Sequence, residues 1–259
     1  MPEVEATLAV TSETPAEVAE RIAALDGLGP YRFRWLDVRE LRDVYLDTAA
    51  RELGDRALAL RLRREGTGWR ITLKGPGRPA AGGAVERSEL ELKWSPAALG
   101  RILAALRDHG VELPDAASAV SGADAGDPVD AVRAAGFRVL QDRRTRRARA
   151  RVARADGRNG TLAWLVVDAV RYRTASGRAV RHREVEIEAT PAAPEGVPGE
   201  VAGLLRRRFG DALRTWEHPK LATGQAVAGT EPPAGPDGDL LPAAYDRLER
   251  ELSGGGAGK

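Results

Sequence analysis

The alternation of apolar and polar residues along the chain predicts mostly β-structure. Successive side chains of a strand point to opposite faces, so an apolar residue at every second position indicates a strand with one buried face. Runs with this period predict strands over residues 3–10, 56–64, 69–74, 87–94, 138–152, 161–170 and 183–189.

Other segments have apolar residues three and four positions apart, which is the spacing of one helix face. A proline at the start, a glycine after the end, or both, mark the boundaries of several of them. They predict helices over residues 15–26, 96–109, 128–135, 200–209 and 241–252. Residues 113–128 and 223–240 are rich in Ala, Gly, Pro and Asp, and we expect a surface loop and a linker there. The final SGGGAGK is expected to be a flexible tail.

The polar faces of the predicted strands carry charges that are separated by sign. Leucine, isoleucine, valine and tryptophan occupy one face of these strands, and charged side chains occupy the other. The acidic faces contain Glu3 and Glu5 on the first strand, and Glu184, Glu186 and Glu188 on the last. The basic faces contain Arg61 and Arg63 on one strand, and Arg70 and Lys74 on the next.

Two architectures are compatible with a charged strand face. The simpler one is an antiparallel sheet with one face on the core and one in solvent. Solvated faces usually mix signs, however, because like charges on neighbouring positions repel. Separation by sign favours a closed or nearly closed sheet with a charged interior, whose apolar exterior is covered by helices.

A charged interior of both signs indicates the chemistry of its ligand. Carboxylate oxygens are preferred ligands of Mg²⁺ and Mn²⁺, which are usually shared between protein and substrate phosphates. Arginine and lysine form charge-assisted hydrogen bonds with phosphate oxygens. The strand pattern therefore predicts binding of a polyphosphate together with a divalent metal.

Composition excludes several other classes of site. The 259 residues include no cysteine, which excludes disulfides, thiolate zinc sites and cysteine nucleophiles. The 40 basic and 38 acidic residues leave a formal charge of +2, so there is no general attraction to nucleic acid or to an anionic membrane. The first residues have no signal-peptide pattern, and no apolar stretch is long enough to span a bilayer, so we expect a cytoplasmic protein.

An arginine-rich run between residues 143 and 154 is the best candidate for a nucleic-acid surface. Few aromatic residues are interleaved with it, which argues against base stacking. A long strand with one arginine row in the interior and another in solvent is the favoured interpretation, and a nucleic-acid partner is not expected.

Short motifs in this chain resemble those of the CYTH superfamily, also called triphosphate tunnel metalloenzymes. The opening EVEAT (3–7) resembles the family signature ExExK, and HPKLATG (218–224) resembles the late lysine motif of thiamine-triphosphatase-like members. Between them the family order is followed by VYLDT (44–48), ALRLR (59–63), TLKGP (72–76), RSELEL (87–92), VVD (166–168) and REVEIE (183–188). The resemblance covers residues 1–224. It leaves residues 225–259 as a linker, a short amphipathic helix and a tail.

The resemblance implies an α+β fold built on an eight-stranded antiparallel β-barrel tunnel with a charged lumen and helices packed outside. It also implies hydrolysis or cyclisation of triphosphate compounds with Mg²⁺ or Mn²⁺. By this resemblance, the metal carboxylates are Glu3, Glu5, Glu184, Glu186 and Glu188. The phosphate-binding cations are Arg61, Arg63, Lys74, Arg144 and Lys220, with Arg143 as the alternative to Arg144.

The remaining matches are Glu89, Glu91 and Asp168, which the resemblance implies position a second metal or the attacking water. The expected reaction is in-line phosphoryl transfer to water. Its substrate would be a small molecule such as inorganic triphosphate, a nucleoside triphosphate or thiamine triphosphate. The oligomeric state stays open, with a homodimer among the alternatives.

One residue departs from the family pattern. Thr7 stands where the family signature has a lysine, so one positive charge is missing from the first strand. This departure keeps two alternatives open beside a triphosphatase: a non-catalytic module that binds polyphosphate or nucleotide, and an adenylate cyclase of the class IV type.

Overall fold

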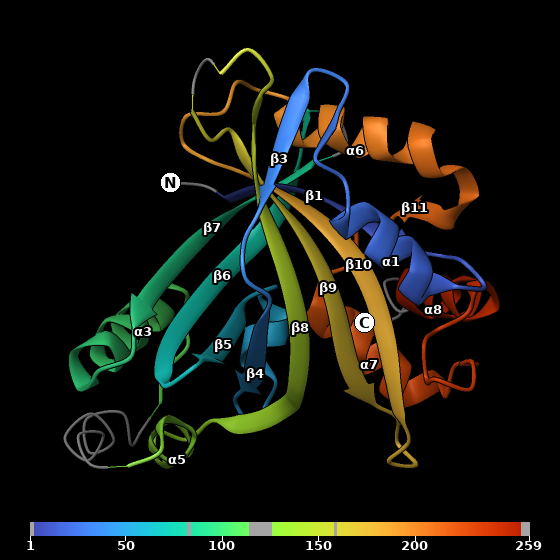
Figure 1. Ribbon diagram of the computed structural model, residues 1–259. Helices are drawn as coiled ribbons and strands as arrows, with labels where there is room; N and C mark the ends of the chain where they lie inside the picture. Colours follow the sequence, from blue (N-terminus) through green and yellow to red (C-terminus); the bar gives the residue numbers. More distant parts are fainter. Residues whose placement is uncertain (1–2, 82–83, 114–125, 158–159, 255–259) are drawn as a thin grey trace. The chain divides into compact units, whose positions relative to one another are not determined.

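The computed structural model describes residues 3–81, 84–113, 126–157 and 160–254, which form strands and helices in an α+β arrangement (Figure 1). The strands are β1 (Glu3–Val10), β2 (Gly27–Leu28), β3 (Tyr31–Trp35), β4 (Arg39–Asp47), β5 (Ala59–Glu65), β6 (Gly68–Ala80), β7 (Ala84–Lys93), β8 (Arg138–Arg154), β9 (Ala163–Arg173), β10 (Ala179–Ala189) and β11 (Leu213–Thr215). The helices are α1 (Pro15–Ala23), α2 (Glu52–Asp55), α3 (Pro96–Asp108), α5 (Pro128–Ala134), α6 (Val197–Phe209), α7 (Lys220–Thr230) and α8 (Pro242–Gly254), with a 3₁₀ turn, η2 (Gly210–Ala212).

The hydrogen-bonded order of the strands returns on itself. It runs β8-β4-β5-β6-β7-β1-β10-β9, and β9 pairs again with β8. The registers of β1 with β10, β10 with β9, and β9 with β8 are antiparallel, as are those of β4 with β5 and β5 with β6. An antiparallel order of eight strands that closes in this way is that of a β-barrel, which confirms the predicted fold class.

The described residues divide into two compact units, and β6, β7 and β8 each continue from one unit into the other. The first unit contains residues 40–78 and 87–143. Its core joins the leucine face of β5 and the Ile71–Leu73 face of β6 to the apolar sides of α3 and α5. The alternation predicted for these strands is confirmed, because Leu60 and Leu62 are fully buried in this core.

The second unit contains residues 3–39, 79–86 and 144–254. Helices α1 and α6 pack on β1 and β10, where Val185 and Ile187 are completely buried. A separate apolar cluster links β9 and β10 to α7 and α8, and it contains Tyr172, Trp216 and Tyr245.

Two of the predicted helix starts have the expected cap. Ser95 Oγ accepts a hydrogen bond from the Ala98 N–H at the start of α3, and Asp127 Oδ1 accepts one from the Val129 N–H at the start of α5. These bonds satisfy backbone donors that a helix leaves without partners at its first turn.

Some predicted elements were wrong in extent. The strand predicted over 56–64 begins only at residue 59, because α2 and a turn precede it. The predicted linker over 223–240 is helical up to Thr230, where Ala226 and Val227 are buried although the sequence KLATGQAVAGT contains glycines and threonines that disfavour helix. Strands β3 and β4 were not predicted. Parts of the predicted loop and tail, at 114–125 and 255–259, lie outside the described residues.

None of the helices in the described part of the chain combines the length and the apolar character of a membrane span.

Candidate metal- and phosphate-binding residues

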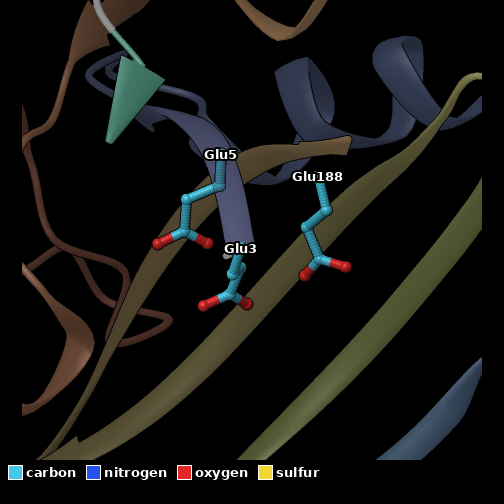
Figure 2. Close-up of side chains that lie close together, drawn as sticks. All are labelled: Glu3, Glu5 and Glu188. Carbon is cyan, nitrogen blue, oxygen red and sulfur yellow. The ribbon is translucent and has the colours of Figure 1, made fainter. Parts of the chain in front are cut away.

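Three glutamates from β1 and β10 form what we call the first acidic group: Glu3, Glu5 and Glu188. The two strands are antiparallel neighbours, and their register sets Glu5 opposite Glu188. One carboxylate oxygen of each residue lies within 4.8 Å of the others, and Figure 2 shows the three side chains close together. A set made only of carboxylate oxygens has the chemistry of a site for a hard divalent cation, so these residues fit Mg²⁺ or Mn²⁺.

A second acidic group contains Asp168 of β9 and Glu184 and Glu186 of β10, and all three residues are buried. Their oxygens also lie within 4.8 Å of one another, because Glu184 is opposite Asp168 in the β9–β10 register. The ammonium of Lys220, the first residue of α7, lies among them. It contacts Glu184 and Glu186 directly and lies 3.3 Å from Asp168 Oδ2. The five predicted metal carboxylates are therefore divided between two groups, of which the second is neutralised in part by lysine.

Arg147 of β8 is a further cation of the second group, and sequence analysis did not assign it. Its guanidinium donates to both oxygens of Asp168, at 2.8 and 2.6 Å, and to Glu186 Oε2 at 2.9 Å. The β8–β9 register sets Arg147 opposite Asp168, which explains the two-pronged contact. Burial alone would lower the pKa of Arg147, but the negative charges of Asp168 and Glu186 hold it well above its ordinary value.

Burial and neighbouring carboxylates both affect Glu186. Burial raises the pKa of Glu186 well above its ordinary value, and Glu5, Asp168 and Glu188 raise it further, while Arg147 opposes them. The excess of buried negative charge at this position makes it favourable for a cation to bind nearby.

The first unit contains a separate buried charge cluster around Asp43 of β4. Arg63 donates to both Asp43 oxygens, at 2.7 and 3.0 Å, and Arg143 approaches one of them at 3.4 Å. Burial would raise the pKa of Asp43, but the guanidinium groups of Arg63 and Arg61 hold it well below its usual range. Sequence analysis did not single out Asp43. It lies two residues before Tyr45, and both side chains contact Arg143.

Two of the predicted phosphate-binding cations of this unit face Glu89 and Glu91 of β7. Arg61 Nη2 lies 3.9 Å from Glu89 and 3.5 Å from Glu91, and Lys74 Nζ lies 3.6 Å from Glu89. The buried Nε of Arg61 donates no hydrogen bond to any described residue. Opposite charges on β5, β6 and β7 thus meet in pairs.

The structure distinguishes Arg144, which the sequence analysis preferred as a phosphate-binding cation, from its alternative Arg143. Arg143 is fully buried beside Asp43, whereas Arg144 is exposed on the opposite side of β8. The same alternation continues along the strand, with Arg146 exposed and Arg147 contacting the second acidic group. Counting by two from Arg143 is the signal that would have identified Arg147.

A cavity of about 980 Å³ lies elsewhere in the second unit, between the β2–β3 hairpin and the end of β8. None of the predicted site residues lines it.

Comparison with protein families supplies the assignment. The CYTH domain matches residues 1–206 of this chain. The chain belongs to the CYTH family. Helices α7 and α8 lie beyond the residues that match the CYTH domain.

One solved structure of a similar protein supports the same fold. A putative adenylyl cyclase from Hippeastrum, HpAC1, is described as having a dominant triphosphatase activity. It is 20% identical to this CYTH chain with a TM-score of 0.53, and the match covers 93% of this chain and 98% of that one. A putative adenylate cyclase from Bacillus halodurans is 19% identical with a TM-score of 0.46, covering 83% and 94% of the two chains. The search of curated proteins found no match.

Proposed function

We propose that this CYTH protein is a metal-dependent phosphohydrolase that cleaves small molecules containing a triphosphate. The first acidic group carries the proposal: three glutamates from paired strands present carboxylate oxygens within 4.8 Å of one another. Membership of the CYTH family and the triphosphatase activity described for the Hippeastrum protein support it.

In this proposal Glu3, Glu5 and Glu188 hold Mg²⁺ or Mn²⁺. A bound divalent ion would supply positive charge to the phosphate oxygens as negative charge develops in the transition state. Glu184 and Glu186, also predicted as metal carboxylates, are assigned instead to holding Lys220, which contacts both of them.

In this proposal, the cations that bind the phosphate oxygens are those that are paired with carboxylates in the structure. Arg61, Arg63, Lys74 and Lys220 each lie within an ion-pair distance of an acidic side chain. An incoming triphosphate offers these cations charge-assisted hydrogen bonds of the same kind, so it can replace the carboxylates as their partner. Arg143, which is buried, is a better phosphate ligand in this proposal than the exposed Arg144.

A carboxylate is still needed to orient the attacking water. For this role we keep the three residues that were assigned from the sequence, Asp168, Glu89 and Glu91. Asp168 is the most rigid of the three, because Arg147 binds both of its oxygens. Fixed geometry of this kind favours in-line attack, since orientation contributes much of the rate of phosphoryl transfer.

A binding module without turnover is the alternative that a specific observation favours. Thr7 is opposite Glu186 in the β1–β10 register, so the missing lysine leaves that buried carboxylate without a charge that the family signature would supply. Lys220 contacts Glu186 in its place. If this substitution has removed turnover, the protein should bind triphosphate without cleaving it, and Thr7→Lys should restore cleavage.

The test is phosphate release from a panel of inorganic triphosphate, ATP, GTP and thiamine triphosphate with Mg²⁺ or Mn²⁺. We expect release from at least one compound by the wild type. Glu5→Gln and Arg61→Ala should reduce kcat/KM by about 100-fold or more, since each removes a charge that the transition state needs.

Glu20→Gln is the matched control, because Glu20 is an exposed residue of α1 outside both acidic groups. It should behave as the wild type does. Equal background release by the wild type, Glu5→Gln and Arg61→Ala would contradict the proposed hydrolysis.

A further inference from the structure

A buried histidine connects the second acidic group to the C-terminal helix. His182 of β10 lies two residues before Glu184, so both side chains are on the same face of the strand. The His182 side chain is completely buried. Its Nε2 lies 2.9 Å from Glu184 Oε2, and its Nδ1 lies 3.1 Å from the hydroxyl of Tyr245 on α8.

The chemistry of the partners determines the direction of these hydrogen bonds. An ionised glutamate can only accept, so His182 Nε2 carries the proton and donates to Glu184. In the neutral ring Nδ1 is then the acceptor, and the Tyr245 hydroxyl donates to it. Burial raises the pKa of Tyr245, which keeps its hydroxyl protonated. The chain of donors therefore runs from Tyr245 through His182 to Glu184.

Aromatic packing fixes the histidine ring in this position. The ring centroids of Trp216 and Tyr245 lie 5.9 and 5.6 Å from that of His182, and that of Tyr172 lies at 6.3 Å. Such an enclosed ring cannot turn without displacing several buried side chains.

The same aromatic cluster holds the lysine that enters the acidic group. The Tyr172 hydroxyl donates to the Lys220 backbone carbonyl at 2.9 Å, and the Trp216 indole N–H donates to Thr223 of α7 at 3.0 Å. Glu184, held on one oxygen by His182, contacts the Lys220 ammonium through the other. Both partners of this ion pair are thus oriented by residues of one cluster.

A segment outside the matched CYTH residues completes this arrangement. The CYTH match ends at residue 206, whereas Tyr245 lies on α8. The chain leading into α8 is attached to β10, because Arg183 binds both oxygens of Asp239 and the Leu240 N–H donates to the Arg181 carbonyl. Helix α8 itself packs against α7 through the shared apolar cluster (Figure 1).

We infer that His182 and Tyr245 are positioning residues that orient Glu184, and through it Lys220, for binding the phosphates of the substrate. Helix α8 is thereby a part of the candidate active site rather than an appendage to it. This inference rests on the proposed function, in which Lys220 is a phosphate-binding cation.

Two substitutions of His182 separate positioning from packing. The amide nitrogen of His182→Gln reaches the place of Nε2 and can still donate to Glu184, whereas that of His182→Asn reaches only the place of Nδ1. The probe is inorganic triphosphate, with affinity measured by calorimetry in EDTA, where no turnover occurs, and KM and kcat measured with Mn²⁺.

We expect His182→Asn to weaken triphosphate binding by about 10–100-fold, the range found for residues that orient metal-binding side chains. KM should rise by a similar factor, with a smaller change in kcat. His182→Gln should stay within about threefold of the wild type. Tyr245→Phe, which keeps the ring but removes the donor, should fall between them.

Leu248→Ala is the matched control on α8, because Leu248 is equally buried in the same apolar cluster and has no polar group. It should lower the unfolding temperature and leave triphosphate affinity unchanged. Equal affinities for His182→Asn and the wild type would overturn the inference. Equal weakening by His182→Asn, His182→Gln and Leu248→Ala would also overturn it, because that result indicates packing alone.

A wild type that neither binds nor cleaves triphosphate would refute the proposed function instead. In that case the ¹⁵N NMR signals of the histidine rings decide the inference, since the chain has only three histidines. A shift of the unprotonated Nδ1 signal of His182 in Tyr245→Phe would support positioning by Tyr245, and an unchanged Nδ1 signal would overturn it.

Discussion

The charged side chains of this CYTH domain differ greatly in how deeply they are buried, and Asp43 is among the most buried in the first unit. Its side chain is fully buried, and Arg61, Arg63 and Arg143 all lie within 4.0 Å of it. Removing one partner of a buried ion pair leaves the other charges without compensation, which costs more than the pair itself contributes.

We therefore expect Asp43→Asn to lower the free energy of unfolding by about 3–5 kcal/mol at pH 7. Urea unfolding measures this value. Asp142→Asn is the control, because Asp142 pairs with Arg42 at the surface of the same unit, and exposed pairs contribute at most about 1 kcal/mol.

The pH dependence of the Asp43 effect has a defined sign. The pKa of Asp43 is lower in the folded protein than in the unfolded chain, so the stabilisation is present above the ordinary value of about 4 and is lost as the pH falls below it. The difference between wild type and Asp43→Asn should shrink progressively below pH 4. A difference that stays constant down to pH 2 would show that the charge of Asp43 is not its cause.

The sequence predicted which strand positions form the charged faces better than it predicted which of these side chains contact one another. The charged faces that contain Arg61, Arg63 and Glu184 follow from alternation, because a strand has a period of two and one apolar face. Alternation places Arg147 on the same face as Arg143, but the contacts of Asp43 and Arg147 do not follow from it, since they depend on the register between strands. The roles assigned to the site residues remain predictions.

Among the elements, β8 shows most clearly how strand register determines which charged side chains contact one another. Its arginines alternate between an exposed face, which includes Arg144 and Arg146, and a face on which Arg143 and Arg147 contact carboxylates. The composition of this run alone suggested a nucleic-acid surface. The contacts of Arg147 with Asp168 and Glu186 show that arginines on one face of β8 form ion pairs within the protein.

Adjacent positions of β8 provide a direct comparison. Arg147→Gln should lower the free energy of unfolding by about 3–5 kcal/mol, because Asp168 and Glu186 remain buried without this cation. Arg146→Gln should change it by no more than about 0.5 kcal/mol, as is usual for exposed residues. The two variants remove the same group one residue apart, and urea unfolding at pH 7 compares them. Equal effects would contradict the placement of Arg147 among the carboxylates.

The elements that sequence analysis missed are those whose stability comes from tertiary contacts. Helix α7 contains residues of low helix propensity, and it forms where Lys220, Thr223 and Val227 are buried against the rest of the second unit. Strand β4 lacks a strict alternation of apolar and polar residues, whereas β3 alternates strictly but over only five residues. Both pair with β8, which supplies the backbone hydrogen bonds that their sequences do not specify.

At the scale of the whole molecule, the near-cancellation of 40 basic and 38 acidic residues hides a local order. Each of the two units buries its own cluster of opposite charges, and each cluster joins several strands. Buried charges on this scale are costly for folding, which makes a functional reason for them more plausible than a structural one.

Whether this CYTH protein hydrolyses a triphosphate can be decided by ³¹P NMR of the products. The protein is incubated with Mn²⁺ and either inorganic triphosphate or ATP, and the phosphorus signals are followed with time. We expect a diphosphate and inorganic phosphate from at least one substrate, with Glu5→Gln inactive under the same conditions. Cyclic AMP with pyrophosphate from ATP would instead indicate a cyclase. Unchanged spectra of both substrates, combined with tight binding, would contradict hydrolysis and indicate a binding module.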